Sequence, residues 1–397
     1  MNVAALKSRD FRIYLFGNVF ALNGLWMQRL TIGWLAWDMT ASASFVGLVA
    51  FANFSPTMVA GPFFGVLVDR VRTRVAAMIT QSLLCFLAIF LFASHSLGLI
   101  GPVLLVSVSG LLGIAMAAHH PIRMSLAPRL VDKADVASVV SLAAINFNLA
   151  RLTGPALGGW VIAIGGVGVS LLLQAAFYLP FIFALSYLRP RERTRSSAEK
   201  LPFLKDLAIG IRHVMRSPLI RQAILVTGVG ALVSRGVLEI LPAIADGVFD
   251  RGATGLGILT SVAGLGALVA GITTAVMPRQ STHRLPHFAL LSALLGLGMV
   301  PLVGYSEIWP FTLVLVGCLG FATTMTGVSM QTAIQIELDD DLRGRVMSLW
   351  VLVSIGATAT GAVFLGALAD LVGLAAGLSL IGGVGLVFLA AYVWHIW

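Results

Sequence analysis

The segment Gly65-Val-Leu-Val-Asp69-Arg70-Val-Arg72-Thr-Arg74 decides the fold prediction, because it places one acid and three arginines between two long apolar stretches. Charges in that position predict a tight turn at a membrane face. The missing side chain at Gly65 lets two helices approach closely, and Asp69 can receive a helix N-terminal dipole or an arginine. The arginines hold the loop on the cytoplasmic side. The segment therefore predicts a transporter loop between two membrane helices.

The composition supports a membrane setting. Of the 397 residues, 58% are hydrophobic and 11% are charged, and the mean hydropathy is +0.96. A spanning helix needs about 20 mainly apolar residues, and segments of that kind leave almost nothing for a soluble domain. We predict an all-α integral membrane protein with twelve transmembrane helices. The predicted spans are 12–37, 43–68, 74–94, 99–123, 136–163, 166–188, 218–245, 253–277, 285–304, 308–334, 345–369 and 373–396.

Basic residues in the loops gather on one side of the predicted membrane. They occur before the first span and in every second loop, and only Arg251 lies on the opposite side. The positive-inside rule then places both termini in the cytoplasm of a plasma membrane, or bacterial inner membrane. The net charge of +9 reflects this topology and contact with anionic lipid headgroups. We expect no nucleic-acid binding, because no soluble basic face exists.

The sequence repeats itself at half length, which predicts two six-helix halves. The recurring positions, at offsets of 206 or 207 residues, are Ser141 and Ser348, Gly154 and Gly361, Gly159 and Gly366, and Arg29 and Arg235. We predict an N-terminal bundle over 1–188, a cytoplasmic linker over 189–217 and a C-terminal bundle over 218–397. Within the linker, Phe203 to Met215 is expected to form a short helix along the membrane surface.

Four charged residues fall inside predicted spans, where each costs at least about 2.5 kcal/mol at the helix centre. They are Arg29, Arg151, Arg235 and Glu239. Arg235 and Glu239 are four residues apart, so on a helix they share a face and can pair. Either they form a locked structural ion pair, or Glu239 gains and loses a proton during coupling. Three arginines against one glutamate favour an anionic or zwitterionic ligand, unless some of the arginines snorkel to the cytoplasmic surface.

Amide side chains on the same spans are candidates for lining a cavity with these charges. They are Asn23, Gln28, Asn53, Asn146 and Asn148. Each is equally a candidate for an interhelical hydrogen bond. Tryptophans such as Trp26 are ordinarily interfacial anchors, although aromatic residues of the first span could instead contact a planar ligand.

The sequence gives no sign of a cofactor, a metal site or an enzyme. It contains no GxxxxGK[ST] phosphate loop, so we expect no ATP hydrolysis. Cys85 and Cys318 lie inside apolar segments without metal-ligand spacing. The adjacent His119 and His120 point about 100° apart on a helix, which disfavours a shared metal.

Two motifs resemble the major facilitator superfamily, and the resemblance covers essentially the whole chain. Gly65 to Arg74 resembles that superfamily's loop signature GxLaDRxGRR, with Arg72 where a glycine is usual and Thr73 where a basic residue is usual. The segment starting at Ala150 is similar to the helix-5 antiporter motif GxxxGPxxGG, with Ala150 in place of the first glycine. It supplies Gly154, Pro155, Gly158 and Gly159. Asp341 to Ser348 further resembles the branch that contains enterobactin exporters and macrolide efflux proteins.

The residue types of the helix-5 motif give a physical reason for the role that the resemblance implies. Its glycines remove side chains from one helix face, and Pro155 deletes a backbone hydrogen bond, so the helix can pack closely and bend. A bend beside a cavity allows rocking between two states. The alternative is a purely structural kink.

The resemblance implies a secondary active transporter that works by alternating access, most simply a proton-coupled exporter of a small amphiphilic or anionic molecule such as a siderophore or drug. Glu239 is then the coupling candidate, the three arginines are the cavity charges, and Asp69, Arg70 and Arg74 form the cytoplasmic gate. An importer or a lysolipid transporter would share the fold. A non-transporting scaffold or sensor would leave the buried charges unexplained. We expect a monomer whose partners are the substrate, protons and membrane lipids.

Overall fold

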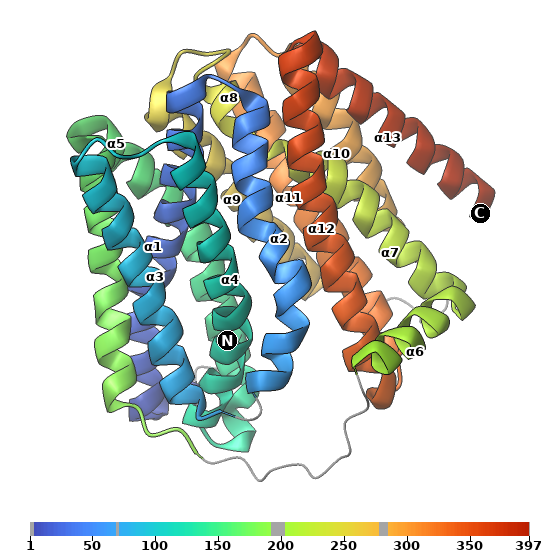
Figure 1. Ribbon diagram of the computed structural model, residues 1–397. Coiled ribbons are helices and arrows are strands. Elements are labelled where there is room, and N and C mark those ends of the chain that lie inside the picture. Colours follow the sequence, from blue (N-terminus) through green and yellow to red (C-terminus); the bar gives the residue numbers. More distant parts are fainter. Residues whose placement is uncertain (1–3, 69–70, 192–202, 278–284, 397) are drawn as a thin grey trace. The chain divides into compact units, whose positions relative to one another are not determined.

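A computed structural model describes residues 4–68, 71–191, 203–277 and 285–396, and every regular element within these ranges is a helix (Figure 1). The predicted all-α class is confirmed. The chain divides into two compact units. The first unit comprises Met1–Ala41, Ala52–Arg195 and Pro242–Ser261, and the second comprises Ser42–Phe51, Ser196–Leu241 and Val262–Trp397. Residues 42–51 thus group with the second half of the sequence and residues 242–261 with the first. The bundle boundaries predicted from the sequence, 188 and 218, stay a prediction.

Helices α1 (Arg9–Thr40) and α5 (Val136–Tyr187) form the main contact of the first unit. Glycines of α1 make this contact close, because a Cβ atom at Gly17 would lie 2.9 Å from the Cα atom of Phe181. Ser8 caps the start of α1 by accepting a hydrogen bond from the backbone amide of Phe11. The unit also contains η1 (Ala4–Lys7), α3 (Thr73–Ser96), α4 (Pro102–Leu126), η2 (Ala127–Leu130), η3 (Lys133–Asp135) and the part of α2 (Ala43–Val68) that follows residue 51.

Helix α5 consists of two helices that meet at Gly166. This glycine has φ 80° and ψ 173°, a conformation that residues with a Cβ atom rarely adopt. The sequence predicts that one span ends at 163 and the next begins at 166, so the break lies where it was expected. The continuous range of α5 therefore holds both predicted spans.

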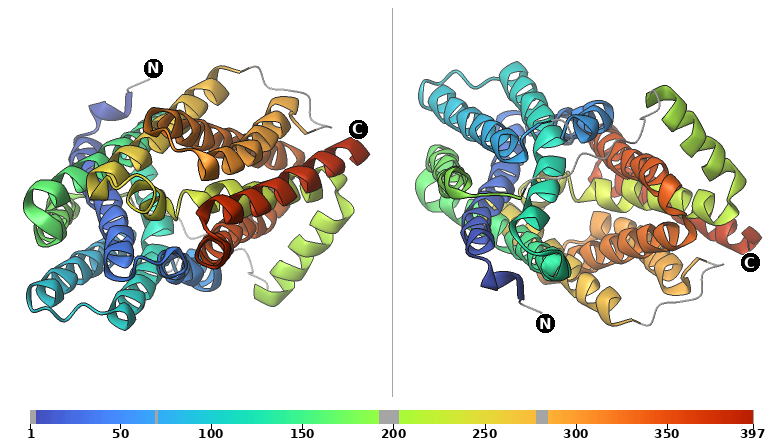
Figure 2. Two further views of the ribbon diagram at one scale, coloured as in Figure 1. Left: turned by 90° about the horizontal axis from the view of Figure 1, so that it is seen from above. Right: turned by 90° about the horizontal axis from the view of Figure 1, so that it is seen from below.

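The second unit is built mainly from helices of the second half of the sequence. They are α6 (Phe203–Arg216), α7 (Pro218–Gly230), the π-helix η4 (Ala231–Arg235), α10 (His287–Tyr305), α11 (Trp309–Glu337), α12 (Asp340–Val372) and α13 (Leu374–Ile396). Helix α9 (Gly252–Val276) joins this unit from Val262 onward. The end-on views of Figure 2 show α12 beside α7, in agreement with their contacts.

The predicted surface helix is present as α6. It bends by 103° into the span that begins at Pro218, and Figure 1 shows it lying across the end of α12. Its exposed residues include the apolar Ile211 and Met215 beside the basic Arg212 and Arg216. That combination is typical of a helix lying at a membrane surface.

The single helix predicted over 218–245 is wrong. The backbone is α-helical to Gly230, widens into a π-helix that ends at Arg235, and then makes turns before the short helix α8 (Leu241–Ala245). Backbone hydrogen bonds of the i to i−3 type, such as that from the Glu239 amide to the Gly236 carbonyl, replace the helical pattern. Apolar composition alone does not distinguish a continuous helix from an interrupted one, because both bury the same side chains.

Nine helices within the described ranges are long and apolar enough to cross a membrane, or ten when the bent pair of α6 and α7 is one span. Helix α1 is not among them, and α5 is counted once despite its break. The predicted number of twelve stays a prediction. Apolar side chains also cover much of the outside: Val103 is 81% exposed, Val387 69% and Phe183 63%. Surfaces of this kind are stable in lipid and would aggregate in water.

Candidate functional site

Two arginines from different helices lie over one tryptophan in the first unit. The guanidinium carbon of Arg29 on α1 is 5.3 Å from the centroid of the Trp26 ring, and that of Arg151 on α5 is 5.8 Å from the same centroid. Arg29 also lies 4.5 Å from the ring of Phe54 on α2. Phe147 meets Trp26 edge to face, with the centroids 5.8 Å apart. These five residues, here called the Trp26 cluster, combine positive charge with flat apolar surface.

Local spacing explains how each helix contributes to the cluster. Trp26 and Arg29 are three residues apart on α1, and Phe147 and Arg151 are four apart on α5, so each aromatic ring shares a helix face with its arginine. Gly154 then brings the two helices together. A Cβ atom at this position would lie 2.6 Å from the Cβ atom of Trp26, which is too close for any residue but glycine.

The cluster is rich in hydrogen-bond donors. The indole Nε1 of Trp26 is buried and has no partner within the described part of the chain, and the same holds for Nδ2 of Asn146, next to Phe147. Beside them, Asn23 Oδ1 accepts a hydrogen bond of 2.7 Å from Thr153 Oγ1. Two guanidinium groups and the unsatisfied indole N–H suit a ligand that carries acceptor atoms and negative charge.

The structure brings Asn23, Arg29 and Arg151 together, but it gives other predicted amides separate hydrogen bonds. Gln28 is 2% exposed, and its Oε1 accepts a bond of 2.7 Å from Tyr178. Asn53 Nδ2 donates to the Ser109 carbonyl at 3.3 Å. Asn148 donates to the Ala144 carbonyl of its own helix. For Gln28 and Asn53 these bonds are interhelical, which is one of the two interpretations that the sequence left open.

The cluster's aromatic members and Thr153 were not among the predicted site residues. For Trp26 and Phe147 the spacing from the arginines was a usable signal, because an aromatic residue three or four positions before an arginine shares its helix face. Sequence gave no reason to connect α1 with α5, so the convergence of both arginines on one ring could not be predicted.

Arg235 and Glu239 belong to the second unit, in the interrupted segment described above. The helical i to i+4 spacing on which their predicted pairing was based is absent, because Arg235 ends the π-helix and Glu239 lies in the turn after it. Glu239 is half-buried and Arg235 is exposed. The two alternatives predicted from the sequence, a coupling pair and a structural ion pair, both stay predictions.

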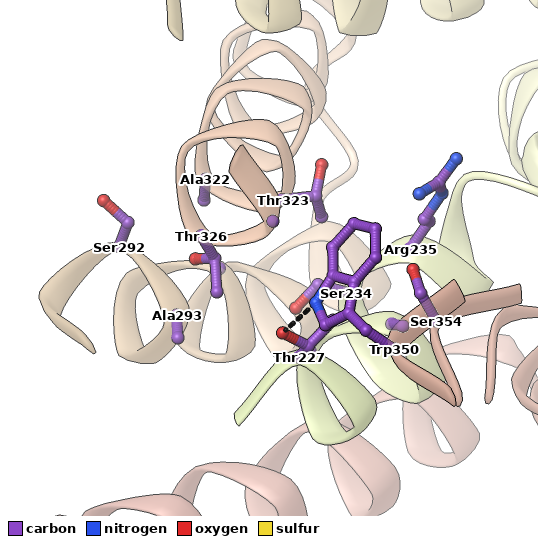
Figure 3. Close-up of a pocket in the computed structure, with 14 residues that line it drawn as sticks. Thr227, Ser234, Arg235, Ser292, Ala293, Ala322, Thr323, Thr326, Trp350 and Ser354 are labelled. Atoms are coloured by element: carbon purple, nitrogen blue, oxygen red, sulfur yellow. Dashed lines mark hydrogen bonds between the residues drawn. The ribbon is translucent and has the colours of Figure 1, made fainter. Parts of the chain in front are cut away.

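Arg235 also borders an open pocket within the second unit (Figure 3). Helices α7, η4, α10, α11 and α12 supply its walls. The lining residues are Thr227, Gly230, Ala231, Ser234, Arg235, Ser292, Ala293, Gly296, Ala322, Thr323, Thr326, Gly327, Trp350 and Ser354. We call it the hydroxyl pocket, because six of these residues are serine or threonine.

Two aspartates hold the starts of helices in place, and neither was predicted as a site residue. Asp370, near the end of α12, accepts hydrogen bonds from the backbone amides of Ala43 and Ser44 at the start of α2, each at 2.9 Å. It also accepts bonds from the Ser42 and Ser44 hydroxyls. In the first unit, Asp246 accepts a hydrogen bond of 3.1 Å from the Gly252 amide at the start of α9, and one of 2.8 Å from Trp37 Nε1 near the end of α1.

The sequence matches a protein family described as transmembrane secretion effectors, over residues 1–396. The chain belongs to this family of major facilitator transporters. A similar relative is the staphyloferrin A transporter of Staphylococcus aureus (strain NCTC 8325 / PS 47), 22% identical over 93% of this chain and 92% of the relative. The enterobactin exporter EntS of Shigella boydii serotype 4 (strain Sb227) is 24% identical over 93% of this chain and 87% of its own length.

Solved transporter structures share the fold of this family member. The crystal structure of the nucleoside transporter NupG superposes with a TM-score of 0.76 at 11% identity, and the match covers 97% of this chain and 98% of the other. At that identity the likeness concerns the fold alone. The predicted resemblance to the major facilitator superfamily and to enterobactin exporters is confirmed.

The predicted gating loop of the transporter lies partly outside the described residues, which omit Asp69 and Arg70. Gly65 falls within helix α2. Arg72 is exposed at the N-cap position of α3, and the guanidinium of Arg74 donates to the carbonyls of Leu185 and Ser186 at the end of α5. Arg74 thus ties the start of α3 to the last turn of α5, and the role of the loop in gating stays a prediction.

A second tie on the same predicted side joins the loop after α4 to the start of the linker. Arg191 forms an ion pair with Asp132, and this hydrogen bond to the guanidinium lowers the pKa of the Asp132 carboxyl. Both side chains are exposed, so the pair contributes little to stability.

The helix-5 motif produces close contacts in the transporter. Gly158 faces Leu30 and Met27 of α1, and a Cβ atom at Gly159 would lie 2.6 Å from the Ala253 carbonyl oxygen of α9. Pro155 lies inside α5, and its carbonyl oxygen would be 2.9 Å from a Cβ atom at Gly257. The motif therefore seats α5 against two helices of the first unit.

Proposed function

We propose that this transporter exports a small anionic amphiphile in exchange for protons, and that the Trp26 cluster binds the anionic part of the substrate. The observation that carries the proposal is the convergence of Arg29 and Arg151 on the Trp26 ring. The guanidinium groups bind a carboxylate or another anion of the substrate, and the rings of Trp26 and Phe54 contact its apolar part.

The energetics of the cluster favour this use. A guanidinium over an aromatic face is stabilised by roughly 0.5 to 2 kcal/mol, depending on how dry the site is. That stacking orients the planar donor fork, the group whose geometry recognises an oxyanion in a bidentate way. A cationic substrate would be repelled by two arginines, and a purely apolar one would leave the buried Trp26 Nε1 unsatisfied.

The named relatives support an exported chelator as the substrate class. One is a staphyloferrin A transporter and another an enterobactin exporter, so a siderophore is the first compound class to test, followed by anionic drugs. We place both termini and the linker over 189–217 in the cytoplasm, because the basic residues of the loops gather on that side.

For energy coupling we propose proton antiport through Glu239. It is the acidic residue nearest to Arg235 in the sequence, and it lies in a turn where the backbone is not locked in a helix. A carboxyl group there can change its surroundings when the cavity changes sides. Protonation on one side and release on the other would then drive the exchange.

The decisive experiment is solute accumulation in everted membrane vesicles from cells that overproduce the protein. The panel contains siderophores, anionic drugs, cationic drugs and lysolipids, each with and without a protonophore. We expect accumulation of an anionic compound that collapses when the proton gradient is removed. Accumulation only in right-side-out vesicles would make the protein an importer, and headgroup-dependent accumulation of lysolipids would replace the substrate class.

Matched variants connect the transport to the cluster. In the double variant Arg29→Gln, Arg151→Gln we expect transport of the anionic compound to fall at least tenfold. Arg212→Gln removes an exposed arginine of α6, outside the cluster, and should leave transport unchanged. Equal loss in both variants would show that the effect is one of net charge and would contradict the proposed site.

A further inference from the structure

The hydroxyl pocket has a distinct chemistry from the Trp26 cluster. Among its lining residues Arg235 is the single charged side chain, while six are serine or threonine and one is Trp350. In Figure 3 the Trp350 ring stands in the middle of the labelled residues, with Thr227 and Ser234 beside it. The indole Nε1 donates to Thr227 Oγ1 at 3.3 Å, so the ring is held by one edge.

The threonine hydroxyls of the pocket have already used their protons. Thr227 donates to the Ala223 carbonyl at 2.8 Å, Thr323 to Gly320 at 3.2 Å and Thr326 to Ala289 at 3.3 Å. A hydroxyl has one proton and two lone pairs, so these three oxygens can only accept hydrogen bonds. The walls of the pocket are therefore complementary to a ligand that carries hydrogen-bond donors.

Ser234 adds an unmet hydrogen-bonding group. Its side chain is 2% exposed, and its Oγ has no hydrogen-bond partner among the described residues. Leaving such a group unsatisfied costs about 1 to 3 kcal/mol. Ser234 lies on the π-helix η4, and π-helical turns inside longer helices often occur at functional sites. A cost of this size at a pocket wall indicates a partner that arrives with a ligand.

We propose that the hydroxyl pocket binds a neutral phenolic ring. The ring's hydroxyl donates its one proton to a threonine oxygen and accepts a hydrogen bond from the Ser234 hydroxyl, and the face of the ring packs on Trp350. A cationic ring is disfavoured by Arg235, and a carboxylate would meet the lone pairs of three threonines. The inference goes beyond the proposed function, because it concerns a separate site that lies wholly within the second unit.

The test is direct equilibrium binding to the purified full-length protein in lipid nanodiscs, without any gradient. The probes are resorcinol, which has two phenolic hydroxyls, toluene, which has none, and the charged rings benzoate and benzylammonium. Calorimetry gives the affinity of each. We expect resorcinol to bind more tightly than the other three, because it alone is neutral and supplies donors.

Two substitutions in the pocket and one outside it locate the binding. Ser234→Ala and Thr326→Val should each weaken resorcinol binding by roughly three- to tenfold, the range for one hydrogen bond. Ser261→Ala is the control, because Ser261 Oγ on α9 is also buried and without a partner in the described residues but does not line the pocket. Equal effects of all three variants, or toluene binding as tightly as resorcinol, would overturn the proposal.

The same preparation separates the two proposals. The pocket variants could weaken resorcinol binding while vesicles that contain the protein accumulate no anionic compound. This result would contradict the proposed function but support the proposed phenol site in the hydroxyl pocket. Proton-dependent accumulation of an anionic compound, in a protein that does not bind resorcinol, would overturn the pocket alone.

Discussion

Gly361 is the position where a single methyl group should do most damage to the second unit. A Cβ atom placed there would lie 1.8 Å from the carbonyl oxygen of Leu232 and 2.7 Å from its carbonyl carbon. Real Cβ atoms essentially never come closer than 3.0 Å to another heavy atom, so Gly361→Ala requires a displacement of about 1.2 Å. The obstructing atoms belong to the backbone, and therefore η4 or α12 must move as a whole.

The expected magnitude follows from two opposing terms. Overpacking a tight interior costs about 1 to 3 kcal/mol, and a clash with backbone lies at the upper end because no rotamer change relieves it. Replacing glycine by alanine inside a helix returns roughly 0.5 to 1 kcal/mol. We expect Gly361→Ala to lower the free energy of unfolding by about 2 kcal/mol, measured by equilibrium unfolding in mixed detergent micelles.

Two further variants make the result specific. Gly298→Ala on α10 places its methyl group where no atom lies within 4 Å, so it should be neutral or slightly stabilising. Leu232→Ala removes a side chain but not the clashing carbonyl, so it should fail to rescue Gly361→Ala. Unchanged stability of Gly361→Ala, or rescue by Leu232→Ala, would refute the backbone contact between η4 and α12.

Three other predictions concern single charges. Asp370→Asn should destabilise the protein by about 1 kcal/mol in thermal unfolding, because the carboxylate caps the start of α2, whereas the exposed Asp38→Asn should have no effect. Arg74→Gln should cost about 1.5 to 3 kcal/mol through loss of its bonds to the end of α5, and Arg72→Gln, at an exposed position, less than about 0.5 kcal/mol. Glu239→Gln should abolish gradient-driven accumulation in everted vesicles while the protein still inserts and folds, and retained coupling would exclude the proposed role.

Much of the fold could be predicted because lipid imposes simple rules. Long apolar runs must be helices, so the helical class and most of the helix positions follow from hydropathy. The break at Gly166 coincides with the predicted end of a span, because a glycine with positive φ is the residue type that such a turn requires. Helix α6 could be predicted because its sequence mixes apolar and basic residues. This composition suits a helix at a membrane surface.

The sequence identified candidate site residues on single helices, but it did not show which residues of different helices come together. Arg29 and Arg151 were identified by the cost of a charge in lipid, but their shared partner Trp26 depends on the packing of α1 against α5. The interruption after Arg235 was missed because most of its residues are apolar, and because Pro242 near the start of α8 is a residue type that continuous membrane helices also tolerate. The hydroxyl pocket left no signal, since serine and threonine in a membrane helix ordinarily bond to their own backbone.

The internal repeat explains why the two units have similar packing and different chemistry. Gly154 contacts Trp26 of α1, and its repeat partner Gly361 contacts Leu232 of η4, where Leu232 is the residue 206 positions after Trp26. The second pair behaves alike: Gly159 approaches Ala253 at the start of α9, and Gly366 approaches Ala43 at the start of α2.

Glycine at these positions is thus required by helix contact in both halves, whatever the ligand. The residue that faces the glycine, Trp26 in the first half and Leu232 in the second, is under no such constraint. The glycine contacts atoms close to its main chain, so the rest of its side chain can differ. Tryptophan at that place in the first half creates a surface for two arginines, whereas leucine in the second half leaves the aromatic contribution to Trp350 of α12. The packing that the two halves share therefore leaves each half free to carry its own recognition chemistry.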